Sequence, residues 1–146
     1  MRVLGIDLGT KRIGVALSDS GGRMATPYDV VHRSGDRRRD HRRIGELAEE
    51  AEAEAIVVGL PLSLDGSDGP AAKQARREAL ELERATGLPV ELWDERLTTV
   101  SAHRDLAALD LDPAARRRVV DKVAASVMLQ AWLDHRRDDT TEEPPA

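Results

Sequence analysis

Residues 1–20 read MRVLGIDLGTKRIGVALSDS, and this stretch decides which fold the chain can adopt. Residues 2–8 are an apolar run with branched side chains, which is typical of a strand. Residues 9–12 supply a turn, and residues 13–18 are a second apolar run. The sequence therefore predicts a β-hairpin that carries one acidic residue, Asp7, at the end of its first strand.

The segments that follow extend this hairpin into a mixed sheet. They are predicted to be a turn (19–23), a strand (27–32), a helix (36–55), a strand (55–60), a polar loop (61–70), a helix (71–86) that Gly87 ends, a strand (89–94), a helix (98 or 99 to about 109) and a last helix (from Pro113, capped by Asp112, to about 135). The strand at 55–60 is apolar throughout, which is typical of a parallel strand buried on both faces. We therefore predict an α/β fold with five strands, the first three antiparallel and the last two parallel, flanked by helices. Such sheets bind ligands at the carboxyl ends of their parallel strands.

Composition narrows the class of protein. The chain has 146 residues and no cysteine, which excludes disulfide scaffolds, thiolate zinc sites and cysteine nucleophiles. No apolar run approaches the roughly 20 residues of a membrane helix, and the first residues lack the features of a signal peptide, so we expect a cytoplasmic protein without membrane contact. We expect one domain at 1–135 and an acidic, disordered tail at 136–146.

At three places in the sequence an acidic residue has surroundings in which burying an unpaired charge would cost free energy. Asp7 has apolar neighbours, although a turn aspartate that accepts backbone N–H groups is an equal alternative. Asp94 and Glu95 end the fifth strand, where adjacent side chains point to opposite faces, so the pattern leaves open which of them faces a site. A solvated strand end with an ion pair to Arg96 is the simpler reading of this pair. Asp121 heads the apolar stripe of the last helix, although an arginine one turn earlier could pair with it.

Taken together, the three acids make a stronger case than each does separately. Carboxylates that converge at one sheet edge bind hard divalent cations through oxygen. With Mg²⁺ or Mn²⁺, such a set suits phosphodiester hydrolysis by two metal ions roughly 4 Å apart. The sequence therefore predicts a metal-dependent site at the carboxyl edge of the sheet.

Four motifs resemble the RuvX/YqgF family, whose members are described as pre-16S rRNA nucleases and as Holliday junction resolvases with an RNase H-like fold. The motifs are GIDLGTKRIGVALSD (5–19), VVGLPLSLDG (57–66), WDERLTT (93–99) and DKVAASVMLQAWL (121–133). The resemblance covers residues 1 to about 133. It implies that the catalytic, metal-binding acids are Asp7, Glu95 and Asp121, and it alone selects Glu95 over Asp94.

The resemblance also implies substrate contacts around these acids. The residues concerned are Lys11 and Arg96 as phosphate ligands, and Gly59, Asp65 and Gly66 as part of the loop after the strand at 55–60. Arginine runs at 33–43 and 116–118, which include Arg118, could hold a nucleic-acid backbone, although a solvated helix face is the more common meaning. The net charge of −5 argues against binding by bulk charge. The four histidines, among them His41, show no ligand spacing and are expected at the surface.

Several functions fit this pattern. The first is a metal-dependent nuclease that processes the 5′ end of pre-16S rRNA. An alternative is a resolvase of four-way DNA junctions, which should be a symmetric dimer, so both a monomer and a homodimer are open. A non-catalytic nucleic-acid-binding module is weaker, because the three acids are intact. The DLGT sequence at 7–10 also resembles the phosphate loop of actin and sugar kinases, which need two such domains, whereas this chain has one such motif.

Overall fold

The computed structural model describes residues 1–97 and 113–141, with side chains for 1–97 and 123–137. Its elements are β1 (Val3–Leu8), β2 (Arg12–Ser18), β3 (Ala25–His32), α1 (Arg37–Glu50), β4 (Ala55–Leu60), α2 (Pro70–Thr86), β5 (Val90–Asp94), the 3₁₀ turn η1 (Glu95–Leu97) and α4 (Pro113–Thr141). The helix predicted at 98–109 lies outside the described residues. None of the described helices combines the length and apolar character needed to cross a bilayer.

The five strands form one sheet in the order β3-β2-β1-β4-β5. β1 pairs antiparallel with β2, and β2 pairs antiparallel with β3. β4 pairs parallel with both β1 and β5. The predicted sheet of three antiparallel strands followed by two parallel ones is confirmed. Because β1, β4 and β5 run in the same direction, their carboxyl ends meet at one edge of the sheet.

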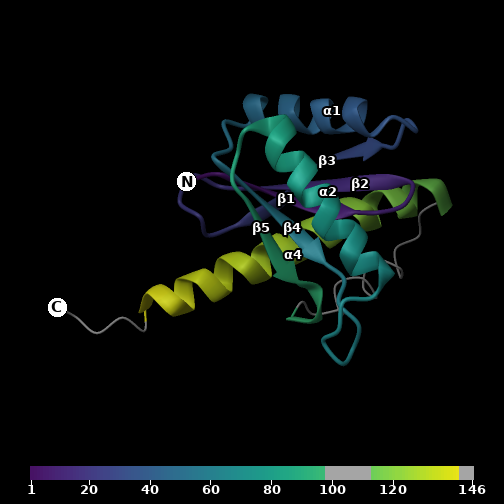
Figure 1. The fold of residues 1–146 in the computed structure, drawn as a ribbon. Coiled ribbons are helices and arrows are strands. Elements are labelled where there is room, and N and C mark those ends of the chain that lie inside the picture. Colours follow the sequence, from purple (N-terminus) through teal and green to yellow (C-terminus); the bar gives the residue numbers. More distant parts are fainter. Residues whose placement is uncertain (98–112, 142–146) are drawn as a thin grey trace.

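Helices cover both faces of the sheet (Figure 1). α1 and α2 pack on one face over branched side chains such as Ile6, Val15 and Ile56. α4 packs on the other face, where both tryptophans of the chain, Trp93 and Trp132, join the core. The two tryptophans compensate on this side for the absence of phenylalanine.

The close packing of α4 on β1 depends on Gly5. A Cβ atom at Gly5 would lie 2.8 Å from the Cβ of Leu129 and 3.3 Å from the carbonyl oxygen of Ala125. Farther along, Trp132 and Leu133 line one hollow with Met1 and Val3. α4 therefore runs antiparallel to β1, and its turns before Ala125 lie toward the end of β1 that carries Asp7.

Element ends differ from the sequence prediction at two helices. α1 ends at Glu50 rather than at 55, because the backbone turns through Glu52 at a φ of +56°. The N–H groups of Glu52 and Ala53 there bond the carbonyls of Glu49 and Ala48, which closes the helix. α4 continues to Thr141, so its predicted end at 135 is wrong and the start of the expected tail is helical. The division into a domain and a tail stays a prediction.

We predict that Gly5→Ala lowers stability by about 1–3 kcal/mol, because the added methyl group overpacks the contact with α4. Gly21→Ala is the matched control, since its Cβ would meet only the Asp19 carboxylate at 3.8 Å. Urea unfolding of both variants checks this. Equal stability of the two variants would contradict the importance of this contact.

Candidate active site

The candidate site lies where β1, β4 and β5 end. Asp7 is the penultimate residue of β1, and Glu95 follows β5 directly as the first residue of η1. Gly59 lies in β4, the strand between them. A Cβ atom at Gly59 would lie 2.4 Å from Oε1 of Glu95. The Glu95 side chain therefore crosses β4 over the space that Gly59 leaves open, and its carboxyl group hydrogen-bonds that of Asp7.

This contact changes the protonation of Glu95. Burial raises the pKa of Glu95 most, and the negative charge of Asp7 and the hydrogen bond to it raise it further, to about 7. Asp94 adds a smaller effect in the same direction. Glu95 is therefore partly protonated near neutral pH, where an ordinary glutamate is ionised. A cation placed between the two carboxyl groups would remove their repulsion.

A cleft of about 360 Å³ opens over the two carboxyl groups. Its walls come from the β1–β2 turn, the start of the loop after β4, the first turns of α2, and two arginines at the entrance to α1. The lining residues besides Asp7, Gly59 and Glu95 are Leu8, Gly9, Thr10, Arg33, Arg37, Pro61, Ala71, Gln74, Ala75 and Glu78. The cleft therefore offers acids at its floor and guanidinium groups at its wall.

Asp94 lies apart from this pair. Its carboxylate accepts hydrogen bonds from the Arg96 guanidinium at 2.6 and 3.0 Å, and this pairing lowers the pKa of Asp94. The sequence left open which acid of the pair faces the site. The structure puts Glu95 against Asp7, while the ion pair at the strand end belongs to Asp94.

The residues predicted to contact substrate form two groups on either side of the carboxyl pair. Arg96 donates to the carbonyl of Leu64 at 3.3 Å and lies beside Gly66. Asp65 in the same loop accepts hydrogen bonds from Ser67, and these lower its pKa. Lys11 is exposed in the β1–β2 turn and lines a neighbouring hollow with Thr10. Gly59 lies in β4, at the floor of the cleft, and not in the loop that follows β4.

The third predicted acid, Asp121, lies on α4, but its side chain is outside the described residues, as is that of Arg118. Asp121 is one turn before Ala125, which adds about 6 Å along the helix axis. That turn lies toward the carboxyl end of β1. Among the side chains that the structure does describe, no three His, Asp or Glu residues are grouped closely enough to hold a metal ion.

Sequence reasoning missed a buried charged group beside the cleft. Glu78 on α2 accepts two hydrogen bonds of 2.9 Å from Arg33 and one contact of 2.7 Å from His41. Burial opposes its ionisation, but hydrogen bonds from His41 and Arg33 outweigh burial and lower the pKa of Glu78 to about 2. Arg33 also donates to the carbonyl of Gly9 at 2.7 Å, which fixes the turn after Asp7.

Two expectations are thereby corrected. His41 is only 2% exposed and not a surface residue, because Glu78 supplies a partner inside the protein. Arg33 is committed to that carboxylate instead of lying on a solvated face. A signal was present in the sequence, since Glu78 falls in the apolar stripe of Ala75, Ala79 and Leu82 on its helix.

Comparisons with known proteins support a nuclease-like arrangement. The RuvX family model, described as "Holliday junction resolvase", matches residues 1–135. A Myxococcus xanthus protein named "Putative pre-16S rRNA nuclease" is 48% identical over 145 residues, which cover 99% of this chain and 95% of that protein. A Pelotomaculum thermopropionicum protein of the same name is 49% identical over 92% of this chain and 87% of its own length.

The fold also matches that of a solved structure. The structure of T. thermophilus RuvC in complex with a Holliday junction substrate superposes with a TM-score of 0.57, covering 94% of this chain and 96% of that one. The two sequences are 19% identical, so the likeness concerns the fold. It confirms the predicted RNase H-like architecture.

We predict that Gly59→Ala abolishes activity while the protein still folds. The new methyl group would occupy the place of the Glu95 carboxylate, and the flexible end of that side chain can move away without displacing backbone. Circular dichroism and a nuclease assay on the same sample check this. Gly45→Ala is the control, because its Cβ would meet only a methyl group of Thr86 at 3.8 Å. Full activity of Gly59→Ala would contradict the described position of Glu95.

We predict that Asp7→Asn lowers the pKa of Glu95 from about 7 toward its ordinary value of 4.5 in metal-free protein, because the neighbouring charge is removed. The folded pKa of Glu95 exceeds the unfolded one, so metal-free wild-type protein should lose stability as pH rises from 4.5 to about 7. This loss should shrink in Asp7→Asn and vanish in Glu95→Gln. Carboxyl NMR titration and thermal melts across this pH range measure both effects. An unchanged Glu95 pKa in Asp7→Asn would show that burial alone causes the shift.

Proposed function

This chain belongs to the RuvX family, and we propose that it is a nuclease that hydrolyses phosphodiester bonds in RNA at the 5′ end of pre-16S rRNA. The observation that carries the proposal is the contact between the Asp7 and Glu95 carboxyl groups across Gly59, at the floor of an open cleft. Relatives that share nearly the whole length of this chain carry the rRNA nuclease name.

The donor set of the cleft fits a divalent metal ion. Asp7 and Glu95 offer only carboxylate oxygens, which are the ligands of Mg²⁺ and Mn²⁺. The negative charge of Asp7 helps to raise the pKa of Glu95, and a cation bound between the two groups would oppose that effect. Asp121, on the helix turn that lies toward this edge, completes the proposed set. When bound, such ions activate a water molecule and stabilise the leaving oxygen.

The chain's own groups then have distinct tasks. Asp7 and Glu95 must both be ionised to hold cations, so Glu95 gives up its proton on binding. Lys11 on one side and Arg96 on the other flank the carboxyl pair, and we assign them to phosphates of the bound strand. The hydrogen bond from Arg33 to the Gly9 carbonyl holds the turn that orients Asp7. Asp65 and Gly66 shape the loop on which Arg96 rests.

A second candidate substrate is a four-way DNA junction. The description of the family model and the likeness to RuvC favour it. A junction resolvase must cut two strands symmetrically, which needs a homodimer. The curated relatives, which are far closer in sequence, favour RNA. A protein that binds nucleic acid without cutting it would have no use for the Asp7–Glu95 contact.

We expect the purified protein to cut a pre-16S leader RNA in the presence of Mg²⁺ or Mn²⁺. Asp7→Asn and Glu95→Gln should each lower the rate at least about a hundredfold, since metal catalysis supplies several kcal/mol. Asp19→Asn and Glu83→Gln make the same chemical changes on exposed residues away from the cleft and should keep full activity. The assay compares this RNA with single-stranded DNA and a four-way junction.

The outcomes separate the candidates. Selective, paired cutting of the junction by a dimer would replace the RNA substrate with branched DNA. Cutting that persists in Asp7→Asn would contradict the assignment of the site. Binding without any cutting, by protein that is folded and loaded with metal, would leave a binding module.

A further inference from the structure

The charges of α1 are arranged against the helix dipole. Its first half is rich in arginine, at positions 37, 38, 39, 42 and 43. Its last turns and the turn that follows are acidic, with glutamates at positions 46, 49, 50, 52 and 54. A helix favours the opposite order, because its amino end is already positive and its carboxyl end negative. The order of charges along α1 is therefore unfavourable for the helix dipole, which suits a surface that binds an anionic ligand.

Half of the arginines in this region are neutralised by the protein itself. Arg33 pairs with Glu78, Arg37 with Glu81, and Arg43 with Glu46, Glu50 and Asp29. The other three, Arg38, Arg39 and Arg42, are exposed. Within the described part of the chain, their guanidinium groups make no ion pair. They crowd one surface at the basic end of the helix, although like charges so close repel.

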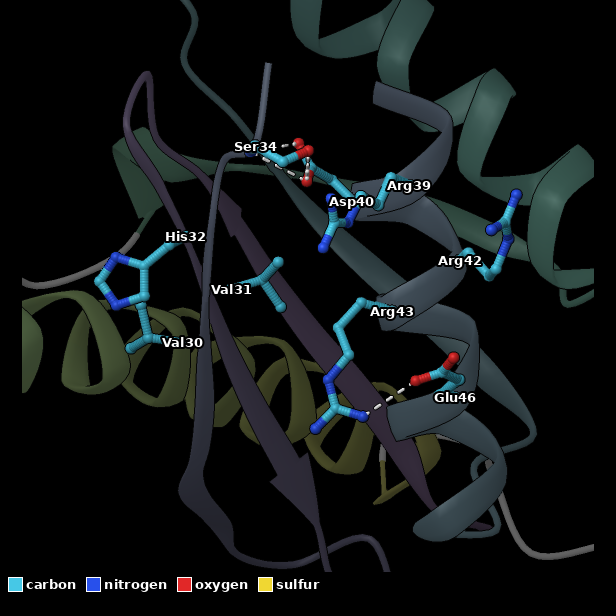
Figure 2. A pocket seen from close by; sticks show the side chains of 9 residues that line it. All are labelled: Val30, Val31, His32, Ser34, Arg39, Asp40, Arg42, Arg43 and Glu46. Carbon is cyan, nitrogen blue, oxygen red and sulfur yellow. Dashed lines mark hydrogen bonds and ion pairs between the residues drawn. The ribbon is translucent and has the colours of Figure 1, made fainter. Parts of the chain in front are cut away.

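These three arginines straddle the solvent-facing ridge of α1. At 100° per residue they fall within an arc of about 100° around the helix axis. Figure 2 shows the hollow between α1 and β3 that both Arg39 and Arg42 line, together with Ser34 and Arg43. Arg42 also lines a hollow on the α2 side together with Arg38 and Arg84.

Neighbouring hollows lie between this ridge and the carboxyl pair. The cleft over Asp7 and Glu95 shares Thr10, Arg33 and Arg37 with the hollow beside Lys11. That hollow in turn shares Asp40 with the one that Arg39 lines. Lys11 and the start of α1 lie close together. The backbone N–H of Arg33 donates to the Lys11 carbonyl at 2.9 Å, and α1 begins four residues after Arg33.

We propose that Arg38, Arg39 and Arg42 bind the phosphate backbone of the nucleic-acid substrate on the side of the cleft next to α1, away from the bond that is cut. The proposal rests on the proposed function for the identity of the substrate. The rise from Arg38 to Arg42 is about 6 Å, which corresponds to about two nucleotides at 3.4 Å each. The glutamates that begin at position 46 end this basic surface, so the contact is confined to the strand nearest the cleft.

The test compares two triple variants in an Asp7→Asn background, so that binding is measured without cutting. Arg38→Gln/Arg39→Gln/Arg42→Gln removes the proposed contacts. Arg23→Gln/Lys73→Gln/Arg77→Gln removes the same charge from exposed residues elsewhere. The probes are labelled single-stranded leader RNA, an RNA duplex and a four-way DNA junction, each titrated at several salt concentrations.

For the α1 variant we expect the slope of log K against log salt on single-stranded RNA to become shallower by about 2, because each lost phosphate contact removes about 0.7. The control variant should keep the wild-type slope. The melting temperature of the α1 variant should equal or exceed that of the Asp7→Asn parent, because the charges removed from α1 oppose its helix dipole. Equal weakening by both variants would overturn the proposal, since net charge alone would then explain binding. An unchanged slope in a folded α1 variant would also overturn it.

The probes and an activity assay separate this inference from the function on which it rests. If the slope changes only with the junction probe, the bound backbone is that of branched DNA. This result would support the α1 contact and contradict the proposed RNA substrate. With Asp7 restored, the α1 variant should raise KM for leader RNA and leave kcat unchanged, because its residues lie outside the cleft floor. A loss confined to kcat would overturn a binding role.

Discussion

The structure is organised around a contact between two acidic side chains. Asp7 and Glu95 would separate in water, but the sheet holds their carboxyl groups together and partly buried. Parallel pairing of β1, β4 and β5 brings the two residues to one edge, and Gly59 leaves the space through which Glu95 reaches Asp7. The energetic cost of this contact is borne by the fold around it. A bound cation would offset this cost, in keeping with the metal-dependent function that we propose.

A second charged group supports the first. Arg33, Glu78 and His41 join the end of β3, α2 and α1 through short hydrogen bonds, and Arg33 continues to the turn after Asp7. Here the charges are opposite, and Glu78 and His41 are buried while Arg33 is partly buried, so each charge has a partner of the other sign or a hydrogen-bond donor. The protein thus places an ion-paired cluster of opposite charges beside a pair of like-charged groups.

Much of this could be predicted from the sequence, because local patterns carry it. The apolar runs around Asp7 predict the hairpin, and the uniform strand at Ala55–Leu60 predicts parallel pairing. Contacts between distant residues could not be predicted in this way. Neither the choice of Glu95 over Asp94 nor the pairing of Arg33 with Glu78 is visible in a local pattern, since each partner lies on a different element. The arginine run at 33–43 likewise mixes paired and exposed members that the sequence does not distinguish.

The topology of the sheet determines when, during folding, Glu95 can reach Asp7. Asp7 lies on a local hairpin that can form early, whereas Glu95 reaches it only after two crossover connections have placed β4 and then β5. Contacts between such distant parts of a chain form slowly, because loop entropy must be lost first. A partly synthesised or partly folded chain therefore has the hairpin and its aspartate but no complete cleft. Assembly of the last parallel strand is therefore the step that brings Glu95 to Asp7 and completes the cleft.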